Sequence, residues 1–200
     1  MRSSQQSTGF GSQPDPSDKI RSVTSRPPFT YQNIDYPLEH LNAFEHTFEV
    51  EAATGTPKRE YTVWVTFGHH CFTEDPKPGD DPALAYLDPI KRDPRTFNFK
   101  RWALSKHLPE IVKTLVKRKV FHTGHKHLYT IEILQPDGER IQYEVYFDIY
   151  RPEQEKRIHL KIASAFARDQ GVGNAARPKP IKFEFVLFNV QNRKALKVPR

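Results

Sequence analysis

Apolar and polar residues begin to alternate after residue 38, first in two runs that cover residues 47–51 and 61–67. A turn-forming segment with glycine and proline, residues 53–57, separates these runs. Alternation with period 2 is typical of half-buried strands, so the two runs predict a β-hairpin. The following residues, 74–95, contain five prolines and are predicted to form an irregular loop.

The apolar positions then change to a helical spacing. Asn98 is a suitable N-cap for a short helix over residues 99–106. Pro109 cannot continue that helix but fits the first turn of another, which predicts a break at residues 107–108 and a second helix over residues 109–119. The second helix has one apolar stripe, formed by Ile111, Val112, Leu115 and Val116.

Four more alternating runs follow the helices. They cover residues 128–134, 140–150, 157–167 and 181–190. Turn-rich segments join successive runs, and short links favour antiparallel neighbours. The predicted architecture is therefore α+β: an N-terminal β-hairpin, one or two helices, then a four-stranded antiparallel meander.

The alternation also predicts two different faces for the meander. One face is almost wholly apolar, should pack on the helices, and includes Tyr129, Ile131, Ile133, Tyr143, Val145, Ile162, Ser164 and Phe183. The opposite face is polar and includes Thr130, Glu132, Glu144, Tyr146, Asp148, His159 and Lys161. A solvated outer face explains this polar surface without any function, and a catalytic or ligand-binding face is the alternative.

Residues 1–33 are rich in Ser, Gln, Pro and Gly, so they are predicted to be a disordered arm, with a single α+β domain over residues 34–200. The first residues lack the apolar run of a secretory signal, and no stretch reaches the roughly 18 apolar residues of a membrane span. We therefore expect a cytoplasmic protein without a membrane partner. A single cysteine, Cys71, excludes an internal disulfide framework.

The formal net charge of +7 is unevenly distributed along the chain. Residues 91–119 carry ten basic and two acidic residues, and residues 168–200 carry eight and two. Two basic segments beside a nearly neutral sheet region favour nucleic acid as a partner, and a solvated helix face and tail are the alternative. The candidates for phosphate contacts are Lys117, Arg118, Lys126, Arg151, Lys161 and Arg168.

Three histidines lie within six residues of one another between the second helix and the first meander strand. Histidine titrates near neutral pH and suits general acid and base work. Metal-independent RNA cleavage needs such groups beside a cation that holds the phosphate. A polar turn with surface histidines is the alternative. The catalytic candidates in this region and on the polar face are His122, His125, His127, Tyr129, Glu144 and His159.

A second cluster, His69, His70 and Cys71, could bind zinc. Adjacent residues on a strand point to opposite faces and no paired CxxC motif is present, so we expect no cofactor and keep zinc as the weaker alternative. The chain contains no P-loop, GxGxxG, GxSxG, HExxH or kinase-type motif. NTPase, Rossmann dehydrogenase, α/β-hydrolase, zincin and kinase functions therefore have no local support.

Four segments, residues 67–73, 121–129, 144–151 and 161–169, together resemble a small, uncharacterised bacterial and prophage family. Some of its members are labelled stationary-phase growth adaptation protein, and the resemblance implies no mechanism. The order of elements also resembles the barnase–EndoU–colicin–RelE group of RNases. That resemblance implies acid, base and phosphate-binding residues on the polar sheet face, with the histidine loop at its edge.

The leading hypothesis is a small, basic, toxin-like protein of bacterial or phage origin that cleaves or binds RNA without a metal, and that is an endoribonuclease if it is catalytic. The alternative is a non-catalytic binding module for nucleic acid or for a protein partner or inhibitor, such as a prophage or defence-related interaction protein. The oligomeric state is open, because exposed strand edges leave room for dimerisation.

Overall fold

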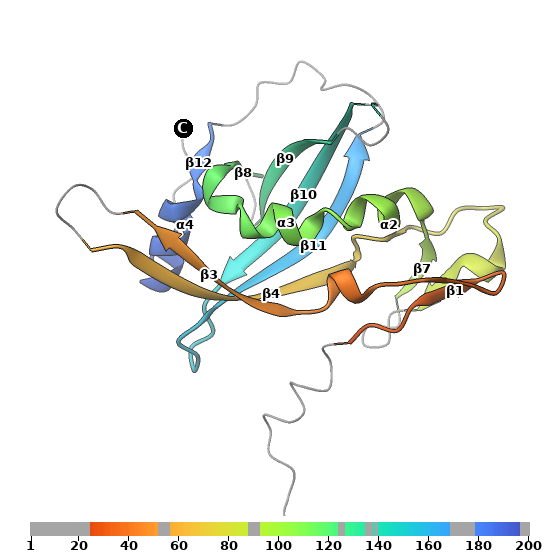
Figure 1. Ribbon diagram of the computed structural model, residues 1–200, viewed down its shortest axis with the longest axis horizontal. Helices are drawn as coiled ribbons and strands as arrows, with labels where there is room; N and C mark the ends of the chain where they lie inside the picture. Colours follow the sequence, from red (N-terminus) through yellow and green to blue (C-terminus); the bar gives the residue numbers. More distant parts are fainter. Residues whose placement is uncertain are drawn as a thin grey trace, which may run out of the picture.

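The computed structural model describes residues 25–51, 57–87, 93–123, 127–134, 138, 140–168 and 179–196. Strands make up 47% of these residues and helices 22%. The predicted α+β class with a four-stranded meander is therefore wrong, because the protein is mostly β and its main sheet has seven strands. Figure 1 shows this sheet as a curled layer with α2 and α3 lying across one side.

The strands of the main sheet follow the order β12-β8-β9-β10-β11-β4-β3. Their bounds are β3 Phe44–Val50, β4 Arg59–His70, β8 Lys119–His122, β9 Leu128–Leu134, β10 Ile141–Tyr150, β11 Ile158–Arg168 and β12 Ile181–Lys182. β3 and β4 form the predicted antiparallel hairpin, but β4 also pairs in parallel with β11. This pairing satisfies the backbone N–H and C=O groups of the long β11 edge, which a separate hairpin would leave unpaired.

Two smaller sheets occupy segments that the sequence pattern left irregular. β1 (Phe29–Tyr31) and β2 (Ile34–Tyr36) form a hairpin whose first strand lies within the predicted arm. The second small sheet has three strands, β5 Thr73–Glu74, β6 Ala85–Leu87 and β7 Pro94–Phe97. Two 3-10 helices, η1 (Glu39–Leu41) and η2 (Pro82–Leu84), also lie in this part of the chain. The predicted loop over residues 74–95 is therefore partly wrong, because β6 and the ends of β5 and β7 lie within it. Pro94 is the first residue of β7, a strand position that tolerates proline.

The first predicted helix is confirmed as α2, Phe99–Ser105, with the Asn98 side chain accepting a hydrogen bond from the Arg101 N–H at 2.9 Å. The second helix is shorter than predicted. α3 covers Leu108–Lys113 and a 3-10 turn, η3, covers Leu115–Lys117. The chain then becomes strand β8, which buries Val120 between β9 and β12. No helix within the described ranges is long and apolar enough to cross a membrane.

The predicted fourth meander strand is an α-helix. Only Ile181 and Lys182 are in a strand, and α4 covers Phe183–Gln191. The apolar residues of this segment fit both periods, but Phe183, Val186 and Leu187 are fully buried, whereas Phe185 is 50% exposed. The buried positions have the i, i+3, i+4 spacing of one helix face, so packing against the sheet decides in favour of the helix.

The register of β9 differs by one residue from the prediction. Tyr129 lies opposite Tyr146, and Thr130 lies opposite the buried Val145. Opposite residues share a face, so Tyr129 is on the polar face and Thr130 is inside. Thr130 tolerates this burial because its hydroxyl donates to the carbonyl oxygen of Lys119 at 2.9 Å.

Glu132 has the same reversed orientation, and its carboxylate forms an ion pair with Arg118. β9 therefore turns Thr130 and Glu132 toward the interior, where they bond to Lys119 and Arg118.

Candidate functional site

A β-bulge shapes the polar face of β11. The pairing of β10 with β11 shifts register after Tyr146, whose partner is Ser164, whereas the next residue, Phe147, pairs with Ile162. Ala163 is the extra residue, and a bulge of this kind reverses the alternation beyond it. Ser164 and Phe166 therefore lie on the polar face together with Lys161, although simple alternation predicts an apolar-face position for Ser164.

Four aromatic side chains follow one another across this face, and we call them the aromatic row: Phe121, Tyr129, Tyr146 and Phe166. The ring centroids of Phe121 and Tyr129 are 5.3 Å apart, those of Tyr129 and Tyr146 5.3 Å, and those of Tyr146 and Phe166 5.6 Å. The last two pairs are nearly parallel, with interplanar angles of 20° and 12°. The Tyr129 and Tyr146 rings in the middle of the row are partly exposed, whereas Phe121 is buried and the Arg101 guanidinium lies over the Phe166 ring, 5.5 Å from its centroid.

A buried carboxylate holds one end of this row. Glu144 is 3% exposed and accepts hydrogen bonds from the Tyr146 hydroxyl at 2.8 Å and the Gln142 amide at 3.0 Å. The Arg168 guanidinium lies 2.7 Å from the same carboxylate. Burial, and then the bond to Glu144, raise the pKa of Tyr146. Glu144 therefore positions the Tyr146 ring and the Arg168 side chain.

The next cross-strand row contains titratable groups. His127 forms an ion pair with Asp148, and Asp148 is the strand partner of Lys161. Phe147 lies opposite Leu128 on the apolar face. The next pair on the polar face after Tyr129 and Tyr146 is therefore His127 and Asp148. An imidazole, a carboxylate and an ammonium group are thus arranged beside the aromatic rings, as acid–base chemistry on a phosphate ester would require.

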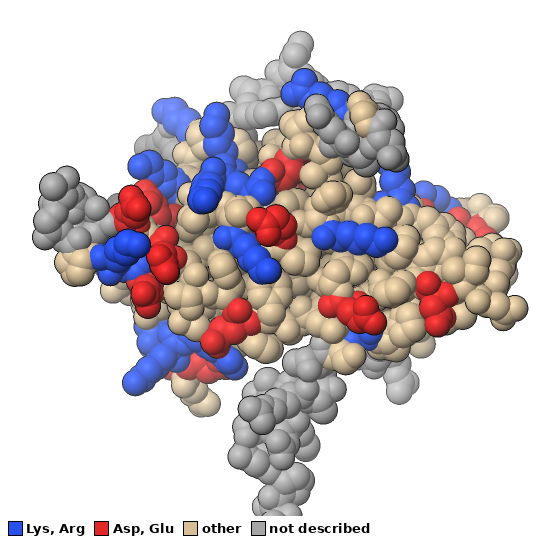
Figure 2. Space-filling model, viewed as in Figure 1, with Lys and Arg blue, Asp and Glu red and all other residues tan. Residues whose placement is uncertain are grey.

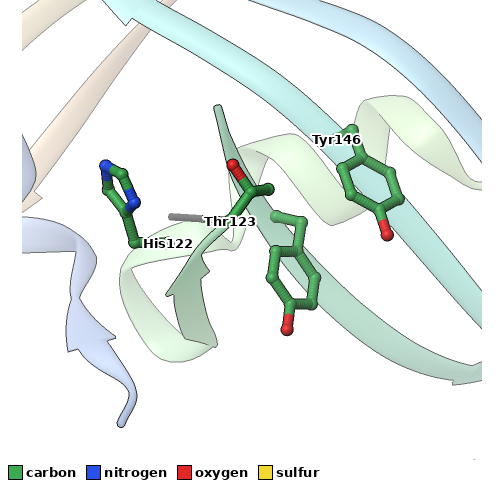
Figure 3. A pocket seen from close by; sticks show the side chains of 4 residues that line it. His122, Thr123 and Tyr146 are labelled. Carbon is green, nitrogen blue, oxygen red and sulfur yellow. The ribbon is translucent and has the colours of Figure 1, made fainter. Parts of the chain in front are cut away.

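A pocket of about 290 Å³ opens where β8 ends (Figure 3), and His122, Thr123, Tyr129 and Tyr146 line it. Five of the predicted site residues therefore lie on the polar face: His127, Tyr129, Glu144, Lys161 and Arg168. His122 lines the pocket, but it is the strand partner of the buried Leu128 and so belongs to the opposite face of β8. Two others, His125 and Lys126, lie outside the described residues.

The predicted residues His159, Arg151 and Arg118 are not gathered at this region. His159 lies 2.8 Å from the Glu155 carboxylate, and Arg151 donates to the carbonyl oxygen of Gln191 at 2.6 Å, which joins the loop before β11 to α4. Arg118 pairs with Glu132 on the helix side. Each of these three side chains is bonded to another part of the protein, which is typical of a structural role.

A basic cluster that alternation does not reveal lies at the β8–β12 edge of the sheet, and we call Lys117, Lys119 and Lys182 the basic edge. All three are exposed, and Lys119 is the direct strand partner of Lys182. Basic side chains are densest in this part of the surface in Figure 2, and acidic side chains are interspersed over the rest of that view. The two basic segments of the sequence thus meet here, and Lys119 is two positions before Phe121 on the same strand.

Cys71 does not fit the zinc alternative. Its side chain is completely buried and its thiol contacts the carbonyl oxygen of Ile162 at 3.8 Å. Burial raises the pKa of Cys71 to about 12, so the thiolate that a metal needs is strongly disfavoured.

The fold defines a mostly β protein whose seven-stranded mixed sheet has one apolar face and one polar face with an aromatic row. The chain belongs to the YjaZ family, whose model matches residues 28–191. It is 28% identical over 177 residues to Protein YjaZ of Escherichia coli (strain K12), which covers 86% of this chain and 94% of that protein.

The relative from Escherichia coli supports the bacterial part of the first resemblance. Neither match supports the stationary-phase label. No solved structure matches the chain, and the seven-stranded mixed sheet gives no support to the RNase-like fold.

Proposed function

We propose that this protein binds single-stranded RNA across the polar face, with bases stacked on the aromatic row and phosphates at the basic edge. The observation that carries the proposal is the row of offset rings on neighbouring strands, two of which, Tyr129 and Tyr146, line an open pocket. Every base has a π-face, and stacking on an aromatic side chain contributes about 1–3 kcal/mol per base.

The charges support binding that depends mainly on stacking. On the polar face, the carboxylates of Glu144 and Asp148 are paired with Arg168 and His127, so this face adds little net attraction for phosphate. Lys119 and Lys182 lie at the Phe121 end of the row and are placed to contact the backbone of a strand that leaves it. A duplex keeps its bases inside and cannot use the rings, so single strands should be preferred.

The first test is the affinity of a fluorescently labelled, unstructured RNA measured by anisotropy at about 50 and about 200 mM salt, with the duplex of the same sequence as a competitor. We expect tight binding of the single strand and weak binding of the duplex. In the Lys119→Ala/Lys182→Ala variant, the slope of log affinity against log salt should fall by about 1.4, because two phosphate contacts are lost.

The matched control is Lys58→Ala/Lys77→Ala, which removes the same charge from two exposed lysines that pair with Glu49 and Glu74 elsewhere. Its salt slope should equal that of the unmodified protein. If the protein does not bind single-stranded RNA, the proposal is contradicted and a protein partner is favoured for this face. If it prefers the duplex, base stacking on the aromatic row is contradicted.

A second candidate function, RNA cleavage without a metal, is favoured by the ion pair of His127 with Asp148 beside Lys161. The His127 imidazole would take the proton of the 2′-hydroxyl as its oxygen attacks phosphorus, and the Lys161 ammonium group would hold the phosphate. The bond from phosphorus to the 5′-oxygen would break, and this leaving oxygen would take a proton from the imidazolium or from water. We expect cleavage of the labelled RNA in EDTA and at least a roughly hundredfold slower reaction for His127→Ala. His107→Ala, which removes an exposed histidine from the α2–α3 junction, is the control. RNA that stays intact would leave binding as the function of this face.

A further inference from the structure

The end of β4 brings together two histidines that adjacent strand positions would separate. The chain turns sharply here, because the N–H groups of Cys71 and Phe72 donate to the carbonyl oxygens of Gly68 at 3.2 Å and His69 at 3.1 Å. As a result the rings of His69 and His70 do not point to opposite faces. Their centroids are 4.4 Å apart and their planes are inclined by only 32°.

Gly68 makes this turn possible at a point of close backbone approach. A Cβ atom on Gly68 would lie 2.7 Å from the carbonyl oxygen of Ala163, the extra residue of the β11 bulge. Only a glycine fits against that carbonyl, so the bulge and the glycine together set the position of the two imidazoles.

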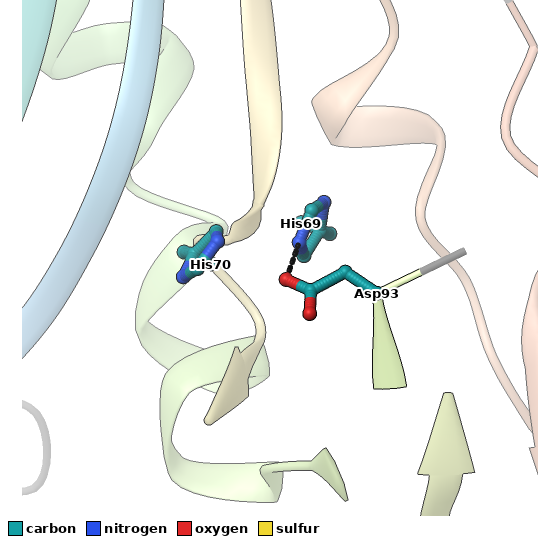
Figure 4. A group of neighbouring side chains, drawn as sticks. All are labelled: His69, His70 and Asp93. Carbon is teal, nitrogen blue, oxygen red and sulfur yellow. Dashed lines mark ion pairs between the residues drawn. The ribbon is translucent and has the colours of Figure 1, made fainter. Parts of the chain in front are cut away.

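A carboxylate from a distant part of the chain completes the group. Asp93 immediately precedes β7, and one of its oxygens lies 3.7 Å from Nε2 of His69. Figure 4 shows His69, His70 and Asp93 converging on one another. One ligand atom from each of the three lies within 4.8 Å of the other two.

These distances are close to those of a metal site. With bonds of about 2.0–2.1 Å, two ligand atoms of a tetrahedral zinc ion are about 3.3 Å apart, so small side-chain rotations would close the group. Two imidazoles and one carboxylate, with water in a fourth position, are a ligand set that zinc uses in proteins. Asp93 is half-exposed, so an ion could enter from that side, whereas His69 is buried.

The surrounding charges permit a cation. Arg95 is the cation that acts most strongly on His70, and its own charge is balanced by an ion pair with Asp75.

We propose that His69, His70 and Asp93 form a binding site for a divalent transition-metal ion, with Zn²⁺ as the ion that best suits these ligands. The site joins the end of β4 in the main sheet to the start of β7 in the three-stranded sheet. It is separate from the RNA-binding function, because none of its ligands belongs to the aromatic row or the basic edge.

The test is titration of tag-free, dialysed full-length protein with Zn²⁺ against a chromophoric chelator, together with thermal unfolding with and without the ion. We expect one equivalent to bind and the unfolding temperature to rise, because an ion that binds the native state stabilises it. In His70→Gln and in Asp93→Asn, the Zn²⁺ affinity should fall by roughly tenfold or more. The ion should then no longer raise the unfolding temperature of either variant at the concentration that stabilises the unmodified protein. Substitution with Co²⁺ should give the visible absorption of a four-coordinate site.

His107→Gln serves as the control, because it removes an exposed histidine outside the group and should leave Zn²⁺ affinity unchanged. Asp93→Asn changes a half-exposed side chain just outside β7, so its fold should be retained even if His70→Gln unfolds. Absence of stoichiometric binding to the unmodified protein would overturn the proposal, and so would an affinity that Asp93→Asn and His70→Gln leave intact.

Discussion

Replacing Phe183 with Ala should lower the free energy of unfolding by about 3–5 kcal/mol, the range for deleting a fully buried phenylalanine ring. The Phe183 ring is completely buried and makes edge contacts with Phe48 and Phe147, at centroid distances of 5.3 and 6.1 Å. It therefore joins α4 to the edge strand β3 and to the central strand β10 of the main sheet. Urea unfolding followed by circular dichroism measures the change as a lower midpoint with an unchanged slope.

Phe185→Ala is the matched control, because it makes the same substitution two residues later at a side chain that is half-exposed. In a helix these two positions face different directions, so the control should cost less than about 1 kcal/mol. In a strand they would share a face and have similar costs. Equal losses of stability would contradict the helical assignment of α4, and Phe183→Leu, which keeps most of the buried volume, should cost about 1 kcal/mol.

The second large effect concerns RNA. Tyr129→Ala/Tyr146→Ala should weaken binding of single-stranded RNA roughly 30-fold or more, because each ring that stacks on a base contributes about 1–3 kcal/mol. These two rings are stacked at 5.3 Å in the middle of the aromatic row and line the pocket beside His122. Anisotropy titrations at a fixed salt concentration measure the loss directly.

Tyr129→Phe/Tyr146→Phe separates stacking from hydrogen bonding. It keeps both rings but removes the hydroxyl that donates to Glu144, so RNA affinity should stay within about twofold of the unmodified protein. If the phenylalanine variant is as weak as the alanine variant, the hydroxyls carry the interaction and the stacking model is wrong. Thermal unfolding of both variants shows whether the fold is retained.

Some of the candidate site could be predicted from the sequence. The alternation in residues 140–150 correctly placed Glu144, Tyr146 and Asp148 on one polar face, because a regular strand obeys period 2 along its whole length. The same reasoning misplaced Tyr129 and Ser164. β9 buries Thr130 and Glu132, which have partners at Lys119 and Arg118, and β11 contains an extra residue at its bulge.

The histidine and aspartate group proposed as a metal site shows the same limit. The sequence pointed to His69 and His70, but neither the turn that brings their rings together nor Asp93 could be inferred from spacing. Asp93 is more than twenty positions away, and it lies near His69 because β7 pairs with β5, the strand that directly follows the turn. Cys71, the neighbour in sequence, is completely buried and its thiol contacts the carbonyl oxygen of Ile162.

The sequence by itself determined the elements whose signals are local: the β3–β4 hairpin, the strands β9, β10 and β11, and the start of α2 at its Asn98 cap. Alternation and capping depend on neighbouring residues, so no tertiary contact is needed to read them. The tertiary structure alone decided the parallel pairing of β4 with β11, the helix at Phe183–Gln191, and the faces of β9 and the end of β11. Each of these was a choice between locally similar alternatives, and burial against residues distant in the chain selected one of them.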